Sequence, residues 1–170
     1  KIQFNNILLG DIWLCIGQSN MEWPMSNEMH FAEETANSYH PLLRFYNPVY
    51  AGKGYYSTTF TDSIVKLLHP ETFYKGQWQN SDSSTFRAMS AVAYYFGKQL
   101  NTALNIPIGL INLSIGGAPL ETFIDISVLK KSQQFSAKQN KDWLVNDALP
   151  VWVRERGQQN VGNASAVPAD

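Results

Sequence analysis

The most constraining feature of this sequence is a short apolar run that leads into a glycine and a serine. Residues 12–16 are Ile-Trp-Leu-Cys-Ile, and Gly17-Gln18-Ser19-Asn20-Met21 follows directly. The run does not alternate with polar residues, which predicts a strand buried on both faces of a sheet. Gly17 permits a sharp turn because it has no Cβ. Ser19 is therefore predicted at the carboxyl edge of that sheet.

Ser19 has two alternative roles in this setting. Glu22 stands three residues later, so Ser19 can simply be the N-cap of a capping box. Alternatively, Ser19 is the nucleophile of an acyl-transfer enzyme, displayed at a strand-to-helix turn beside the free N–H groups of the first helical turn. The local pattern by itself favours the capping role, because capping serines far outnumber catalytic ones.

A second apolar run, at 108–113, leads into a turn with two adjacent glycines, Gly116 and Gly117. Such a turn lets backbone N–H groups approach a ligand closely. Before this run, the apolar spacing predicts a helix that begins at Ser84 or Thr85 and ends at Asn105. Helix, short turn and apolar strand make half of a βαβ unit. The sequence therefore predicts a mainly parallel sheet with helices on its faces.

The rest of the chain adds one clear strand, at 42–46, and several weaker elements. The weaker elements are a short strand within 73–79 and helices at 27–37, 127–139 and 142–156, the last interrupted by Pro150. The tail 157–170 shows no periodicity and is predicted to be a loop or linker. No internal repeat is visible, so residues 1–170 are predicted to form one domain.

The composition argues against several classes of protein. A hydrophobic fraction of 44% argues against disorder, and a net charge of −1 argues against an electrostatic nucleic-acid or membrane surface. No apolar run approaches the length of a membrane span. The lone cysteine, Cys15, is predicted to be a small buried apolar residue. Neither a metal-ligand spacing nor a phosphate-binding loop is found, so no metal and no cofactor are predicted.

Two blocks of the sequence resemble one family of enzymes. Gly-Gln-Ser-Asn-Met after Asp-Ile-Trp-Leu-Cys resembles the nucleophile block of SGNH/GDSL-type hydrolases and, more narrowly, of the sialate O-acetylesterase family. Asn-Leu-Ser-Ile-Gly-Gly-Ala-Pro-Leu-Glu resembles the second block of that family, and residues 90–97 are similar as well. The resemblance covers most of 10–123. It implies an α/β, three-layer, flavodoxin-like SGNH hydrolase fold with a mainly parallel sheet.

The resemblance also implies an activity: hydrolysis of O-acetyl esters on carbohydrates, with sialic acid as the first candidate. Ser19 would form an acyl-enzyme, and the N–H groups of Ser19 and of Gly116 or Gly117 would bind the oxyanion. The resemblance implies a periplasmic or secreted protein in a bacterium, or a lysosomal one in a eukaryote. No cofactor is implied.

Four further residues are candidates for contacts with the substrate. Gln18 and Asn20 flank Ser19 and can orient the turn or touch the sugar. Arg87 precedes the main helix and can meet the carboxylate of an acidic sugar. Glu121 either faces the cleft or is a first-turn carboxylate that is favourable to the helix dipole; both alternatives stay open.

The general base is missing from the pattern. In this family the catalytic histidine lies in a late Asp-x-x-His block, after a block of the Gln-Gly-Glu type, and neither block occurs here. His30, His40 and His69 each lack an aspartate three positions earlier, and each is a weak candidate. The fold is therefore predicted to be incomplete at its carboxyl end.

The chain is accordingly predicted to be the amino-terminal part of an esterase domain, with the Asp-x-x-His block supplied by a further chain or segment. Its predicted partners are that carboxyl-terminal chain and an O-acetylated sugar or sialoglycan. Two alternatives remain open: a glycan-binding module without catalysis, and a structural half that folds only with a partner chain.

Overall fold

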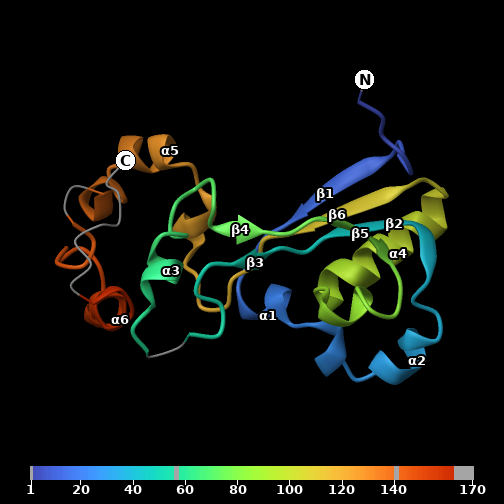
Figure 1. The fold of residues 1–170 in the computed structure, drawn as a ribbon. Helices are drawn as coiled ribbons and strands as arrows, with labels where there is room; N and C mark the ends of the chain where they lie inside the picture. The colour runs from blue at the N-terminus through green and yellow to red at the C-terminus, as the bar shows by residue number, and fades with distance from the viewer. Residues whose placement is uncertain (1, 56–57, 140–141, 163–170) are drawn as a thin grey trace. The chain divides into compact units, whose positions relative to one another are not determined.

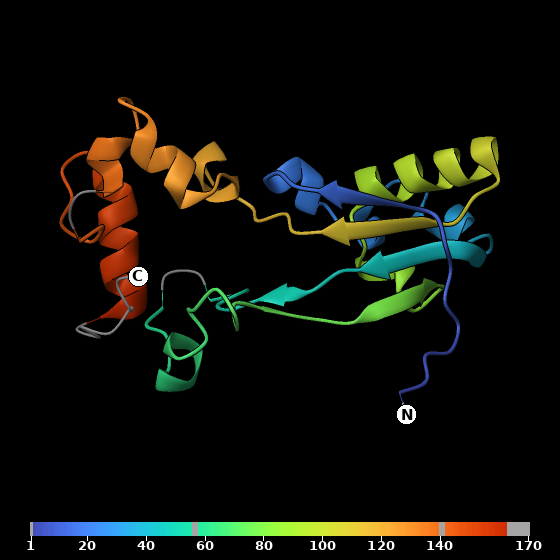
Figure 2. The same ribbon diagram turned by 90° about the horizontal axis from the view of Figure 1, so that it is seen from above.

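A computed structural model describes residues 2–55, 58–139 and 142–162. The chain forms two compact units. Unit 1 comprises 1–48 and 76–122, and unit 2 comprises 49–75 and 123–170. Figures 1 and 2 show helices and strands in the same chain, which confirms the α/β class. That residues 1–170 act as one domain stays a prediction.

Unit 1 is built on a four-stranded sheet in the order β1-β6-β2-β5. The parallel strands are β1 (Asp11–Cys15), β6 (Ile108–Asn112) and β2 (His40–Tyr46). The fourth strand, β5 (Trp78–Ser81), is antiparallel to β2. The predicted mainly parallel sheet is confirmed, and the three predicted apolar strands lie within two residues of their predicted bounds.

The main helix of unit 1, α4 (Ala91–Leu104), packs against β6 and β2. Figure 1 shows α4 and the short helix α2 (Phe31–Thr35) on the same side of the sheet. The contact with β6 is close, since a Cβ on Gly97 would lie 2.6 Å from Leu110 Cδ1. Eleven buried residues form the core: Cys15, Met25, Leu43, Phe45, Phe86, Met89, Ala91, Ala93, Tyr94, Ile108 and Leu110.

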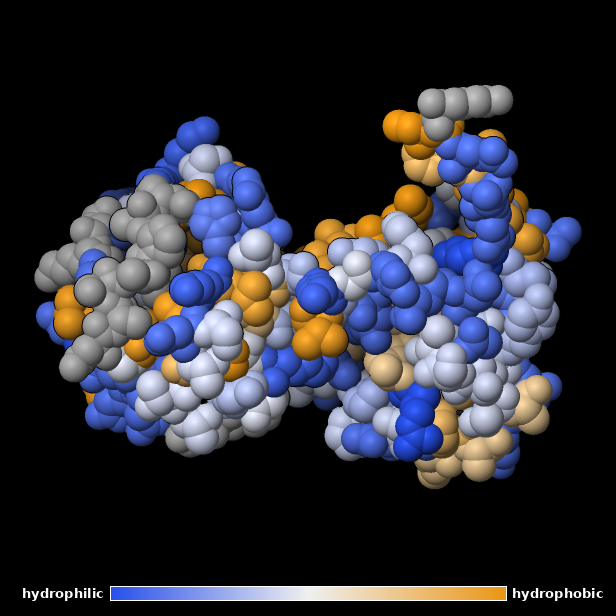
Figure 3. Space-filling view, viewed as in Figure 1, coloured by the Kyte–Doolittle hydropathy of each residue, from blue (hydrophilic) through white to orange (hydrophobic). Residues whose placement is uncertain are grey.

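The prediction that β1 is buried on both faces is wrong. Ile12 is 65% exposed and Leu14 is 58% exposed, whereas Cys15 is buried. The reason is that Ile12 and Leu14 point to the face of β1 opposite to that of Trp13, and α4 packs on the Trp13 face. On one face, Trp13 packs edge-on against Phe96 of α4, with 5.0 Å between the ring centroids. Figure 3 shows hydrophobic side chains gathered along β1.

The start of α4 also differs from the prediction. Its N-cap is Ser90, whose hydroxyl oxygen accepts the N–H of Ala93 at 3.2 Å. Ser84 and Thr85 instead donate their backbone N–H groups to the carboxylate of Asp82, and the 3-10 helix η2 (Phe86–Ala88) follows. The apolar residue at 89 therefore belongs to the core without belonging to the helix. The helix ends at Asn105, as predicted, and Asn105 has a left-handed backbone conformation.

Short helices lie between β1 and β2 in the chain, and a two-stranded sheet lies in unit 2. The 3-10 helix η1 (Met25–Asn27) and α2 lie within the predicted helical stretch 27–37 or at its edge. In unit 2, β3 (Val49–Tyr50) pairs with β4 (Tyr74–Lys75), and α3 (Asp62–Val65) lies between them in the chain. The predicted strand within 73–79 is thus divided between β4 and β5.

The carboxyl-terminal part of unit 2 is helical, with different bounds from those predicted. Its elements are α5 (Ile126–Lys131), the 3-10 helix η4 (Ser136–Gln139) and α6 (Val151–Val161). Pro150 precedes α6 as its N-cap, where a proline costs no helical hydrogen bond. We expected a loop or linker from residue 157, but α6 continues to Val161, and Gly157 lies close to the ring of Trp143. Residues 163–170 lie outside the described part.

In the described ranges, no helix combines the length and the hydropathy that crossing a bilayer requires.

Candidate active site

The turn that carries Ser19 and the turn that carries the two glycines lie side by side. The parallel pairing of β1 with β6 continues beyond the strand ends: Leu113 N–H donates to the carbonyl of Cys15, and Ile115 N–H donates to that of Gly17, both at 3.0 Å. Because both strands end at the same edge of the sheet, the two turns leave it together. This edge is the candidate active site.

Ser19 is the first residue of the short helix α1 (Ser19–Glu22). Its side chain is exposed, and its hydroxyl has no hydrogen-bond partner among the residues that the structure describes. The predicted capping box is wrong: the N-cap is Gln18, without a side-chain cap, and the Glu22 carboxylate bonds elsewhere. Gly17 has a φ of 155°, and a Cβ there would lie 3.0 Å from Met21 Cβ, so the turn requires glycine.

The Glu22 carboxylate joins the two turns. Its Oε2 accepts the backbone N–H of Gly116 at 2.6 Å. A Cβ on Gly116 would lie 2.6 Å from the same oxygen, so a side chain here would displace the Glu22 carboxylate. Gly117 has a φ of 78°, and its N–H donates no hydrogen bond within the described residues. Of the two glycine N–H groups, that of Gly117 is thus the one open to a ligand.

A polar network lies at the end of β6, just before the Gly-Gly turn in the chain. Asn112 Oδ1 accepts the hydroxyl of Ser114 at 2.7 Å, and Asn112 Nδ2 donates to Asn47 Oδ1 at 3.0 Å. Asn47 in turn donates to the carbonyl of Ala88 at 2.8 Å. Asn112 and Ser114 are both buried, and the network ties the ends of β6 and β2 together. The sequence analysis missed this network, although an asparagine at the end of an apolar strand was a usable signal.

The helix α1 is held by the segment that precedes α4. The N–H of Ala91 donates to the carbonyl of Trp23 at 2.9 Å, and the buried hydroxyl of Ser90 lies 3.4 Å from the sulfur of Met21. The residue that caps α4 thereby also packs beneath α1. Tertiary contacts therefore place Ser19, since a four-residue helix has little stability of its own.

The remaining candidate residues are placed in different ways. Gln18 and Asn20 are exposed on either side of Ser19. Glu121 is half-buried in the first turn of the 3-10 helix η3 (Leu120–Phe123). Arg87 is exposed in η2, with its guanidinium 5.4 Å from the ring centroid of Phe31 in α2. The substrate-binding roles of these four residues stay predictions.

The histidines of unit 1 do not contact the Ser19 hydroxyl. His40 begins β2 and therefore lies at the amino edge of the parallel strands, opposite to the edge that carries Ser19. Its Nε2 lies 3.3 Å from the hydroxyl of Tyr94. The Nδ1 of His30 lies 3.3 Å from the carboxylate of Glu33 on α2. A general base for Ser19 is accordingly not found in the described part of unit 1.

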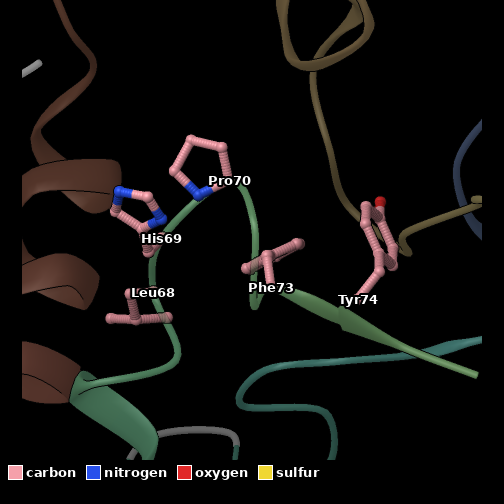
Figure 4. Close-up of a pocket in the computed structure, with 5 residues that line it drawn as sticks. All are labelled: Leu68, His69, Pro70, Phe73 and Tyr74. Atoms are coloured by element: carbon pink, nitrogen blue, oxygen red, sulfur yellow. The ribbon is translucent and has the colours of Figure 1, made fainter.

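The third histidine, His69, lines a pocket in unit 2. The pocket is formed by Leu68, His69, Pro70, Phe73 and Tyr74 (Figure 4). His69 and Pro70 lie on the loop before β4, and Tyr74 begins that strand. The rings of Phe73 and Tyr74 pack edge-on at 4.9 Å, and burial raises the pKa of Tyr74. His69 Nδ1 accepts the N–H of Glu71 at 3.3 Å, so in the neutral ring Nε2 carries the proton.

Comparison with known proteins gives relatives of one kind, although no protein-family model matches the chain. The chain is 29% identical to the sialate O-acetylesterase of Rattus norvegicus over 133 residues, and 31% identical to that of Homo sapiens over 125 residues. A solved structure, that of a carbohydrate acetylesterase from Xanthomonas citri, matches with a TM-score of 0.55 and 27% sequence identity.

These matches cover most of this chain and a small part of each relative. They include 76% and 72% of this chain for the two curated relatives, and 71% for the solved structure. The corresponding shares of the relatives are 23%, 22% and 25%, so the chain spans about a quarter of the length of the proteins that it matches. The family inferred from the two sequence blocks is confirmed, and the chain is a homologue of the sialate O-acetylesterases.

Proposed function

We propose that this chain is part of an enzyme that hydrolyses O-acetyl esters of carbohydrates, with O-acetylated sialic acid as the first substrate to test. The observation that supports it most is the junction of the two turns, where Ile115 N–H donates to the carbonyl of Gly17. The two turns that it joins carry the exposed Ser19 and Gly117, whose N–H donates no hydrogen bond within the described residues. A nucleophile beside backbone donors is the arrangement that acyl transfer needs.

In the proposed reaction, Ser19 Oγ attacks the acetyl carbonyl carbon and loses its proton to a base. The bond between the acetyl carbon and the sugar oxygen then breaks, the sugar oxygen takes the proton back from the base to become a hydroxyl, and an acetyl-serine remains. Water attacks this acetyl group in turn, releases acetate and restores Ser19. The N–H groups of Ser19 and Gly117 would stabilise the negative oxygen that forms in both steps.

We also propose that the base comes from outside this chain. A serine at its ordinary pKa is a weak nucleophile without an adjacent base. His40 lies at the opposite edge of the sheet, and His30 is turned to Glu33. The chain by itself is therefore expected to release acetate slowly, and added imidazole is expected to accelerate the release by acting as the missing base.

The test is acetate release from O-acetylated sialic acid and from acetylated xylan, with and without imidazole. Ser19→Ala is expected to abolish the imidazole-dependent release, whereas Ser26→Ala, a matched change at a neighbouring serine, is expected to retain it. If the wild-type chain and Ser19→Ala release acetate at the same rate in all conditions, the serine mechanism is wrong. Faster release from acetylated xylan than from O-acetylated sialic acid would indicate that the substrates are acetyl esters of plant cell walls.

A second candidate function is glycan binding without catalysis, and the pocket in unit 2 favours it. Phe73 and Tyr74 offer aromatic rings, which pack well against the apolar face of a sugar, and His69 offers an N–H donor. Saturation-transfer NMR with the same sugars tests it. Binding that persists in Ser19→Ala, and is lost in Phe73→Ala, would support a glycan site in unit 2. Covalent labelling of Ser19 by a fluorophosphonate would count for the esterase.

A further inference from the structure

Glu22 lies at the centre of the candidate site, and its contact with Gly116 has a consequence for how the site works. A carboxylate that accepts a backbone N–H at 2.6 Å makes a strong, charge-assisted hydrogen bond. Glu22 is the last residue of α1, so the bond joins the helix that carries Ser19 to the turn that follows β6. The two halves of the site are thereby connected by a side chain as well as by backbone hydrogen bonds.

We propose that Glu22 is a positioning residue of the ester-hydrolysis site: its carboxylate holds the Gly-Gly turn at a set distance from Ser19 and leaves the Gly117 N–H to bind the oxyanion. This inference rests on the proposed function. It assigns different tasks to two adjacent glycines, since Gly116 binds Glu22 and Gly117 binds the reacting oxygen.

The geometry around the two glycines supports this division. A Cβ on Gly116 would meet the Glu22 carboxylate, with Oε2 at 2.6 Å and no other atom nearer than 3.9 Å. A side chain at Gly116 would therefore displace the Glu22 carboxylate from the turn, whereas no left-handed backbone conformation demands a glycine there. Gly117 shows the reverse: its φ is 78°, and a Cβ there would have no atom within 4 Å.

The contact also explains why only one of the two glycine N–H groups is left for the oxyanion. The Glu22 carboxylate takes up a backbone donor that would otherwise compete with Gly117 for the oxyanion. Because the carboxylate is bound to the turn itself, it would restrain the position of the neighbouring Gly117 N–H. A displacement of about 1 Å at such a donor can lower the rate of a reaction about 100-fold.

The experiment compares the wild type with Glu22→Ala and Glu22→Gln, with imidazole as the base. We expect Glu22→Ala to lower kcat about 100-fold with little change in KM, since the sugar contacts are intact. Glu22→Gln keeps an acceptor oxygen and is expected to recover most of the loss. If kcat is unchanged in Glu22→Ala while Ser19→Ala is inactive, the positioning role is wrong and the proposed function stands.

If the wild type releases no acetate, the proposed function fails, and the contact between Glu22 and Gly116 is tested by stability instead. The melting temperature and the amide hydrogen exchange of a set of variants are measured. The positioning contact is supported if Gly116→Ala lowers the melting temperature in the wild type but not in Glu22→Ala, and if Glu22→Ala speeds exchange at the Gly116 N–H alone. Gly117→Ala is the matched control, because its backbone strain is independent of Glu22. Its loss of melting temperature should therefore be the same in the wild type and in Glu22→Ala. Additive effects for Gly116→Ala would overturn the proposal.

Discussion

Four side chains at the amino end of β2 form one hydrogen-bonded cluster. The hydroxyl of Tyr94, which is fully buried, donates to Glu34 Oε2 at 3.1 Å and lies 3.3 Å from His40 Nε2. Lys98 pairs with the same Glu34 oxygen. Burial disfavours the Glu34 carboxylate, but the hydrogen bond and charge of Lys98 outweigh this and lower the pKa of Glu34. The cluster ties α4 to α2 and β2 through polar contacts.

The same cluster makes the stability of the fold depend on pH. Burial, followed by the charge of Lys98, lowers the pKa of His40 below its ordinary value of 6.5. The unfolded chain therefore binds a proton at His40 at a higher pH than the folded chain does, and stability falls as the pH drops below 6.5. The contribution of Glu34 is lost in a separate range, below its ordinary pKa of 4.5.

We therefore expect the melting temperature of the wild type to fall between pH 7.5 and pH 5, and that of His40→Gln to fall less over the same range. The measurement is thermal unfolding followed by circular dichroism at several pH values. A His40→Gln variant whose melting temperature falls as steeply as that of the wild type would show that His40 does not carry this dependence.

At the scale of the element, α4 shows how a local hydrogen bond selects a helix start. The polar residues 84 and 85 and the apolar residue 89 fit a helix that begins early, which is why the sequence favours Ser84 or Thr85 as the cap. In the structure, Asp82 binds both of their N–H groups, and the cap is the buried Ser90. The apolar spacing fits a helix that starts at either place. The carboxylate of Asp82 decides between them, because it binds the N–H groups of residues 84 and 85.

Ser90→Ala is expected to destabilise the protein by about 1 kcal/mol, because the N–H of Ala93 loses its acceptor. Ser84→Ala, at the start that the sequence favours, is expected to change stability by less than about 0.5 kcal/mol since Ser84 is exposed. Urea unfolding of the two variants gives the comparison. Equal losses, or a larger loss in Ser84→Ala, would contradict the observed cap.

At the scale of the whole molecule, β1 is the element that the described chain leaves most open. It is an edge strand with free backbone groups on one side, and Ile12 and Leu14 are exposed on one face. Figure 3 shows the hydrophobic side chains along it. Unprotected apolar edge strands pair with other chains, so the protein is expected to self-associate as its concentration rises.

Leu14→Lys is expected to reduce this association, because a lysine on an edge strand opposes pairing, with little change in melting temperature. Val92→Lys is the matched control: Val92 is 52% exposed on α4, away from the strand edge, and its change should leave the association as it was. Sedimentation velocity over a range of concentrations measures both. Equal reduction by the two variants would mean that net charge is responsible and the edge of β1 is not.

The sequence by itself determined the α/β class, the parallel strands and the two turns that meet at one sheet edge. These follow from local signals, namely apolar runs of strand length and glycines where the backbone must turn. Parallel strands that end together bring their turns together wherever they lie in the chain, so the Ser19 turn could be paired with the Gly116–Gly117 turn from the sequence.

Only the tertiary structure decided that β1 is an edge strand, that Ser90 caps α4 and that Glu22 bonds to Gly116. An apolar run reads the same whether one or two strands flank it, and Ser-x-x-Glu fits a capping box as well as it fits the observed bond. For β1 and Glu22 the deciding partner is distant in the chain, as the 94 positions between Glu22 and Gly116 show. Burial and hydrogen bonding are set by such partners, and periodicity along the chain carries no record of them.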